Sequence, residues 1–356
     1  RRIYGLEHER IKLIMAYTTI NKSTDYFNTN LIPSASEITA VGHQADMIWL
    51  KSRTAAHSHE LIDTVRGISK KLKTDVASAE STDANIITAI GSDSYTVGSS
   101  SNSIYGGNNG VGWSWKANGT GSANTDGDVT STVSVNTTSG FSIVKWDSTG
   151  TAGINIGHGL GQKPAMIIAK CLNQSSTSWP VYHQSLGATK YVSLQATTAE
   201  TTSATRWNNS EPTTTTFQTG SSGDIGGSDR TMIAYCFAEK PGYSKMGSYT
   251  GNGNDNGAFT YTGFFPAFVM LKRTDSTSRW RMYDNKINPF NVADTRLSAE
   301  SNDAENTSAL NAIDMISQGF KIRTSESQLN ASGGSFIYMA FGQSIVGSNN
   351  VPATAR

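Results

Sequence analysis

Three short apolar runs, each closed by a lysine, recur along the chain. They are ADMIWLK ending at Lys51, PAMIIAK ending at Lys170 and PAFVMLK ending at Lys272. Each run has the length of a β-strand and is continuously apolar, which is typical of a buried strand. We expect three buried strands whose lysines emerge into solvent where the strands end.

A second apolar stretch follows each run at a similar distance. These stretches are VGWSWKA, MIAYCFAE and FIYMAFGQ, and their equivalent residues are Trp115, Phe237 and Phe341. Both markers keep their order and nearly their spacing, as in a chain built from three copies of one unit. A unit of about 95–115 residues is long enough for a small β-sandwich of about seven or eight strands.

The sequence therefore predicts an all-β protein of three tandem, jelly-roll-like β-sandwich units behind a short N-terminal helical or extended segment. We place unit 1 at residues 25–118, unit 2 at residues 141–240 and unit 3 at residues 241–343. The other predicted parts are an N-terminal attachment segment (1–24), a linker with one Thr/Val-alternating strand (119–140) and a C-terminal tail (344–356).

Two stretches have the spacing of a helix. Residues 57–73 favour one or two helical turns. Residues 309–317 favour a short helix, because Leu310, Ile313 and Ile316 recur at helical spacing.

Composition supports a folded, polar β-protein. Charged residues make up 16% of the chain and the net charge is +1, which argues against nucleic acid as a partner held by bulk electrostatics. The 7 Trp, 13 Tyr and 12 Phe residues argue against disorder in so polar a sequence. Two cysteines are too few for a disulfide scaffold or a zinc site, and no apolar run is long enough for insertion in a membrane.

Several segments resemble one known family. DYFNTNL, GHGLGQKPAMIIAK, WPVYHQSLGATKY, GSYTGNG and LNASGGSFIYMAF are similar to a domain of bacteriophage tail fibres and related virion structural proteins of cyanophages and marine phages. The resemblance runs from about Met15 to Gln343. It implies concanavalin- or laminin-G-like β-sandwich units in a virion protein. Unit 1 departs from the family at LIPSASEITAVGHQADM, where relatives carry a glycine-rich turn.

The resemblance also implies partners and a location. Phage fibres of this kind are usually trimers, so we expect a homotrimer that is assembled in the host cytoplasm and carried on the virion. Residues 1–22 contain the apolar residues Ile3, Leu6 and Ile11, and we expect them to contact other virion proteins.

Catalytic and metal-binding patterns are weak. No Gly-x-Ser-x-Gly motif occurs, and His57 and His59 have no third ligand at a useful spacing, so we expect no catalytic residue, metal or cofactor. Glycoside hydrolysis needs two carboxylates across a sugar, and Asp63 and Glu80 are possible members of such a pair.

Glycan binding is a more natural use of this composition, because sugars stack on aromatic faces and bind polar side chains through their hydroxyl groups. Trp179 and Trp280 occupy equivalent positions, where either packing in the core or contact with a ligand is possible. Trp207 lies in a polar loop and is expected to be exposed. The candidate ligand-binding residues are Trp179, Tyr182, His183, Trp207, Asn208, Asn209, Trp280, Tyr283 and Asp284.

Three functions are compatible with these observations. The first is a fibre protein that binds a glycan or protein on the host surface through its sandwich loops. The second is a purely structural virion component, such as a capsid fibre, a decoration protein or a tail adaptor. The third, which we rank last, is a polysaccharide depolymerase. We expect the protein not to be an enzyme, and we rank receptor binding first.

Overall fold

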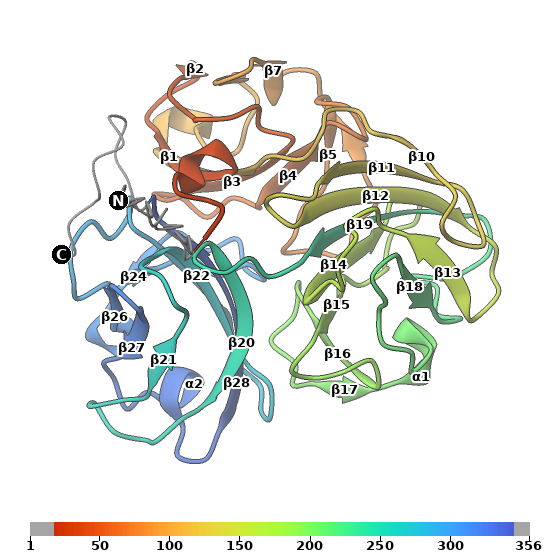
Figure 1. Cartoon of the computed structure of the whole chain (residues 1–356). Helices are drawn as coiled ribbons and strands as arrows, with labels where there is room; N and C mark the ends of the chain where they lie inside the picture. The colour runs from red at the N-terminus through yellow and green to blue at the C-terminus, as the bar shows by residue number, and fades with distance from the viewer. Residues whose placement is uncertain (1–17, 345–356) are drawn as a thin grey trace, which may run out of the picture.

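The computed structural model describes residues 18–344, and almost all of its regular structure is antiparallel β-sheet (Figure 1). This confirms the prediction of an all-β fold. Two short α-helices, α1 (Ala204–Trp207) and α2 (Ser327–Asn330), and three 3₁₀ turns interrupt the strands. The 3₁₀ turns are η1 (Ser23–Asp25), η2 (Tyr105–Gly107) and η3 (Ala309–Asn311).

One strand order occurs three times along the chain. In each unit the first strand pairs with the last, the last pairs with the lysine-ending strand, and that strand pairs with the next one. In unit 1 these are β1 (Phe27–Ile32), β9 (Gly110–Trp115), β3 (Met47–Ser52) and β4 (Glu60–Asp63). In unit 2 they are β12 (Phe141–Ser148), β19 (Arg230–Phe237), β14 (Met166–Cys171) and β15 (Pro180–His183). In unit 3 they are β20 (Ser244–Thr250), β28 (Ser335–Gly342), β22 (Pro266–Arg273) and β23 (Trp280–Asp284).

A smaller sheet lies behind each large one. It consists of β2 (Glu37–Ile38), β8 (Tyr95–Val97) and β7 (Ile87–Ile90) in unit 1, β13 (Ile154–Gly157) and β18 (Thr216–Thr219) in unit 2, and β21 (Phe259–Tyr261), β27 (Gly319–Ile322) and β26 (Ile313–Ile316) in unit 3. Short hairpins complete the pattern: β5 (Lys70–Lys71) with β6 (Ser81–Thr82), β16 (Lys190–Ser193) with β17 (Thr201–Thr202), and β24 (Thr295–Arg296) with β25 (Asn306–Thr307).

The three large sheets share one central core. Trp115, Phe237 and Phe341 meet there, with ring centroids 6.2, 6.0 and 5.6 Å apart. In addition, each unit has an apolar cluster of its own, which fills the space between its large and its small sheet. Each large sheet is therefore buried on both faces, which explains why its lysine-ending strand is continuously apolar. The three lobes of Figure 1, red to orange, yellow to green and teal to blue, meet at this core.

Several local expectations differ from the structure. Residues 57–73 form β4, a turn and β5 in place of helical turns. Residues 309–317 form the 3₁₀ turn η3 followed by β26, because Ile313 and Met315 face the core at the two-residue period of a strand. The expected linker contains β10 (Ser122–Asn124) and β11 (Ser131–Asn136), which extend the sheet of unit 2 beyond β12. The division into separate domains stays a prediction.

The three lysines are buried and do not emerge into solvent as expected. Lys51, Lys170 and Lys272 are at most 1% exposed. Their Nζ atoms donate hydrogen bonds to main-chain carbonyl groups, and Lys51 and Lys272 each reach a carbonyl of another unit, Asn302 and Thr197 respectively. These carbonyls are supplied by segments distant in sequence, so the local sequence does not reveal them.

In each unit, one ring at an equivalent position donates a hydrogen bond to a carbonyl group of a neighbouring unit. The Trp179 indole donates to the carbonyl of Lys73 (3.2 Å), and the Trp280 indole donates to the carbonyl of Ser193 (3.0 Å). In unit 1 the position belongs to His59, whose Nε2 donates to the carbonyl of Ser298 (2.9 Å). The units are therefore joined in a closed cycle by hydrogen bonds as well as by the shared core.

Candidate functional site

The aromatic residues suggested for sugar stacking at the equivalent positions of units 2 and 3 are buried. Trp179, Tyr182, Trp280 and Tyr283 are at most 1% exposed. Besides the junction contacts of the indoles, Tyr182 Oη donates to the Glu211 carboxylate and Tyr283 Oη donates to the Asn311 carbonyl. Of the two alternatives left open by the sequence, the structure shows packing in the core for these four rings.

Their polar neighbours His183 and Asp284 are buried too. His183 Nε2 donates to the carbonyl of Tyr338 at 3.1 Å, and burial lowers the pKa of this imidazole to about 4. Asp284 accepts a hydrogen bond from the Trp113 indole at 3.1 Å, and burial raises the pKa of its carboxyl group. Both side chains hold units together and present no polar atom to a ligand in solution.

Trp207 contradicts the expectation that it is exposed. It ends α1 with 1% of its surface accessible and packs edge-on against Tyr182, with centroids 5.9 Å apart. The polar neighbours of Trp207 do not indicate its burial, because the single turn of α1 turns only the Trp207 side chain toward the core. Asn208 and Asn209 follow in left-handed conformation and are exposed, but the ring expected beside them is in the core.

The carboxylates considered for glycoside hydrolysis are held by an arginine. The Arg66 guanidinium lies 2.6 Å from Asp63 and 3.1 Å from Glu80, and the Asp63 side chain is fully buried. His59 is engaged at a junction between units. Within residues 18–344 no group of three or more His, Cys, Asp and Glu side chains is placed to hold a metal ion. In the same part of the chain no helix is both long and apolar enough to cross a membrane.

Exposed aromatic rings occur instead on the small sheet of unit 3. Phe259 is 49% exposed and Tyr261 is 53% exposed, while Thr260 between them is buried. All three belong to β21, which is an edge strand, and alternate residues of a strand point to the same face. The two rings therefore stand side by side on the outer face, with Cα atoms about 6.8 Å apart at the usual rise of a strand.

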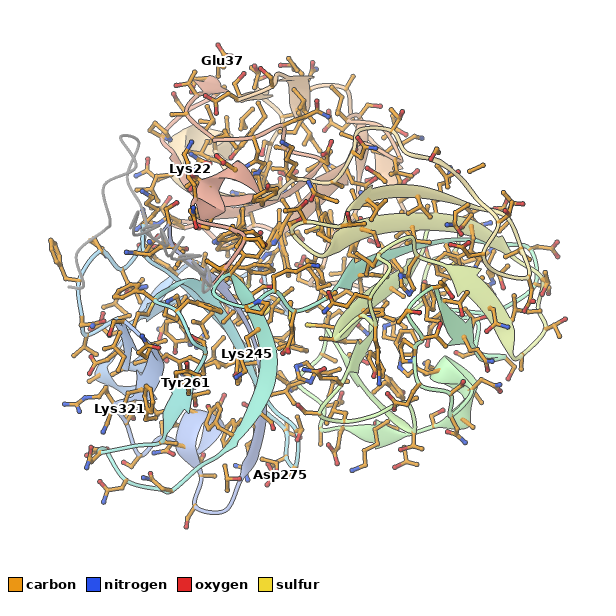
Figure 2. The ribbon with its side chains drawn as sticks, in the orientation of Figure 1. Lys22, Glu37, Lys245, Tyr261, Asp275 and Lys321 are labelled. Atoms are coloured by element: carbon orange, nitrogen blue, oxygen red, sulfur yellow. The ribbon has the colours of Figure 1, made fainter. Side chains whose placement is uncertain are left out.

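Charged groups border these rings. Lys321 on β27 pairs directly with Phe259 in the sheet register, and Asp314 on β26 pairs with Lys321. Lys245 on β20 lies over the Tyr261 ring, with its Nζ 5.4 Å from the centroid, and donates to the Tyr261 carbonyl at 3.2 Å. Figure 2 labels Lys245, Tyr261 and Lys321 in a row across unit 3. We call Lys245, Phe259, Tyr261, Asp314 and Lys321 the β21 face.

The sheet register requires a glycine opposite Tyr261. Gly319 is the register partner of Tyr261, and a Cβ at this glycine would lie 2.0 Å from the main-chain oxygen of Thr260. No larger residue fits there without moving the strand. The register position opposite Tyr261 therefore carries no side chain.

The β21 face combines groups that suit a sugar. A pyranose has an apolar face of C–H groups that stacks on an aromatic ring and a polar edge of hydroxyl groups that bind charged side chains. Phe259 and Tyr261 offer two rings, Lys245 and Lys321 offer hydrogen-bond donors, and Asp314 offers an acceptor.

Comparison with known proteins places the chain in a family. A model of a domain of unknown function (DUF7483) matches residues 22–344. The chain belongs to this family. No curated protein and no solved structure matches it. The match covers all three units, so the family domain includes the whole of the shared core and the β21 face.

The β21 face was missed in the sequence, although a signal was present. The segment FTYT has aromatic residues at alternate positions between threonines, which is the pattern of a strand with one aromatic face. The sequence does not show that this strand lies at the edge of a sheet. That edge position leaves the aromatic face uncovered.

Proposed function

We propose that the protein is a non-catalytic module of a bacteriophage fibre that binds host-surface glycans through the β21 face. The resemblance of the sequence to fibre proteins provides the setting. The observation that carries the glycan assignment is the pair of adjacent, half-exposed rings of Phe259 and Tyr261, bordered by Lys245 and Lys321.

Charge narrows the class of sugar. The β21 face holds two lysines, Lys245 and Lys321, and one carboxylate, Asp314. Asp314 lies 3.4 Å from the guanidinium group of Arg323, which adds a further positive charge next to the face. An excess of positive charge attracts anionic ligands, and the attraction is weakened by salt. We therefore propose that the preferred glycan carries acidic substituents.

The rest of the fold suits a rigid carrier for such a surface. The rings of Trp115, Phe237 and Phe341 tie the three large sheets to one core, and the junction hydrogen bonds close a cycle. A purely structural role in the virion is the second candidate, and this shared core is the observation that favours it. A binding role accounts for the two large rings that remain uncovered on β21.

An array of bacterial surface oligosaccharides, neutral and acidic, tests the proposal. The full chain is expected to bind a subset of acidic glycans, and Tyr261→Ala is expected to lose that binding while melting at the wild-type temperature. Phe290→Ala is the matched control, because Phe290 is a ring of unit 3 that is 76% exposed and lies outside β21. Wild-type protein that binds no glycan on the array, or a Tyr261→Ala variant that binds as well as wild type, would contradict the proposal and favour the structural role.

A further inference from the structure

A polar hollow of about 370 Å³ lies between units 2 and 3. Its charged residues are Lys190 and Glu200 from the hairpin of unit 2. Leu186 and Ile337 provide apolar surface, and hydroxyl groups such as those of Ser248 and Ser335 border it from unit 3. This hollow is separate from the β21 face, because none of its lining residues belongs to that face.

Glu200 occupies a position that recurs at all three junctions. The main-chain N–H of Glu80 donates to Leu172, that of Glu200 to Thr274 and that of Glu305 to Arg53, each at 2.8 Å. In every case the acceptor is the carbonyl of the second residue after the buried lysine of a neighbouring unit. The three glutamate side chains therefore stand at equivalent places in the fold.

At the other two junctions the glutamate binds an arginine. Glu80 lies 3.1 Å from Arg66 and also 3.7 Å from Lys70. Glu305 accepts two hydrogen bonds from Arg53, at 2.6 and 3.2 Å. The Glu80 junction shows that a carboxylate at this place holds a lysine and an arginine together.

At the Glu200 junction both arginine positions are occupied by smaller, uncharged residues. Leu186 takes the position of Arg66, three residues after the end of the equivalent strand, and Thr274 takes the position of Arg53. Lys190 takes the position of Lys70. Among the residues that the structure describes, Glu200 forms an ion pair with Lys190 alone. The hollow is thus the space next to a carboxylate whose two counterparts each bind a guanidinium group.

We propose that this hollow binds the guanidinium group of an arginine side chain from a protein partner. Guanidinium has five N–H donors in a plane, so it can pair with Glu200 while it donates to the hydroxyl groups of Ser248 and Ser335. Its flat face can lie against Leu186. Asp63, the second carboxylate that holds Arg66, is replaced in unit 2 by the neutral His183, so a single arginine binds weakly, with a dissociation constant on the order of millimolar. This inference goes beyond glycan binding and does not depend on it.

Saturation-transfer NMR on the full chain tests the proposal, with N-acetyl-arginine amide as the probe and N-acetyl-citrulline amide as its uncharged isostere. Wild-type protein is expected to transfer saturation to the arginine probe at least fivefold more strongly than to the citrulline probe. Glu200→Gln is expected to remove this difference without changing the melting temperature by more than a few degrees. Equal transfer to both probes, or a Glu200→Gln variant that behaves like wild type, would overturn the assignment.

Leu186→Arg provides an independent arm, since it supplies the arginine within the chain as unit 1 does with Arg66. This variant is expected to lose binding of the probe and to melt at or above the wild-type temperature, while the control Leu186→Met retains binding. A folded Leu186→Arg variant that still binds the arginine probe like wild type would show that the probe does not occupy the hollow.

Discussion

The Nζ atom of Lys245 lies 5.4 Å from the centre of the Tyr261 ring and also donates to the carbonyl oxygen of the same residue. This arrangement joins the large and the small sheet of unit 3 at their outer edge. It holds a half-exposed tyrosine in place without covering its outer face. A ring that is already positioned loses little conformational freedom when a ligand stacks on it, which favours binding.

The charge of the β21 face predicts a dependence on salt. Raising the ionic strength from about 0.05 to 0.5 M is expected to weaken binding of an acidic oligosaccharide severalfold, because screening shortens the range of the attraction. Lys321→Gln is expected to reduce both the affinity and this dependence. Isothermal titration at three salt concentrations measures both quantities. Affinity that does not change with salt would exclude Lys245 and Lys321 as anion-binding groups.

Trp207 is a core residue of unit 2. Trp207→Ala is predicted to lower the free energy of unfolding by about 3–5 kcal/mol, which is typical for loss of a large buried ring. Guanidinium denaturation of the wild type and the variant measures this loss. Asn209→Ala, two residues later on the exposed surface, is the control and is expected to change stability much less. Near-native stability of Trp207→Ala would show that the ring contributes little to the core.

Four buried histidines predict loss of stability in mild acid. Their pKa values in the folded protein are about 3 to 4, because burial disfavours the charged imidazolium, whereas the ordinary value is 6.5. The histidines are His43, His59, His158 and His183. The unfolded chain therefore binds more protons as pH falls below about 6.5, and each histidine removes up to about 1.4 kcal/mol of stability per pH unit.

The measurement is the free energy of unfolding at pH 7, 6 and 5. Buried carboxyl groups such as Asp46 and Asp284, whose pKa values are raised by burial, act in the opposite direction, so the contribution of a histidine is taken from the difference in slope between the wild type and a histidine variant. His183→Gln keeps a donor for the Tyr338 carbonyl and is expected to reduce the slope by the share of one histidine. A slope for His183→Gln equal to that of the wild type would contradict the burial of this ring.

The buried lysines predict that stability rises with pH in alkali as well. Burial lowers the pKa of Lys51, Lys170 and Lys272 to about 8 from the ordinary value of 10.5. The unfolded chain binds more protons than the folded chain between these values, so stability is expected to rise as pH increases from about 8 toward 10. Above pH 10 the raised pKa values of buried tyrosines, such as Tyr235, reverse the trend. Lys170→Met is expected to flatten the rise in the free energy of unfolding measured between pH 7.5 and 9.5. An unchanged slope in this variant would contradict the lowered pKa of Lys170.

The strands with the strongest local signal could be predicted from the sequence. The apolar runs ending at Lys51, Lys170 and Lys272 are central strands, and Trp115, Phe237 and Phe341 lie on the strands beside them. These features depend on apolar residues that are close together in the sequence. The repeated order of the markers also corresponds to the repeated order of strands.

The junctions could not be predicted in the same way. The burial of Trp179 and Trp280 depends on the carbonyl groups of Lys73 and Ser193, which lie 106 and 87 residues away in the sequence. An aromatic residue next to polar ones has the same local pattern whether it stacks on a sugar or crosses to a neighbouring unit. Only the packing of the three large sheets around one core distinguishes a ring that stacks on a sugar from a ring that contacts a neighbouring unit.

The affinity of Tyr261 variants for an acidic oligosaccharide selected on the array tests the central claim most directly. Truncation of a stacking ring typically removes about 1–3 kcal/mol of binding free energy. Isothermal titration is therefore expected to show a dissociation constant roughly 5- to 150-fold larger for Tyr261→Ala than for the wild type. The affinity is expected to fall less for Tyr261→Phe and not at all for Phe290→Ala. A dissociation constant for Tyr261→Ala equal to that of the wild type, in a variant with wild-type melting, would contradict glycan binding at the β21 face.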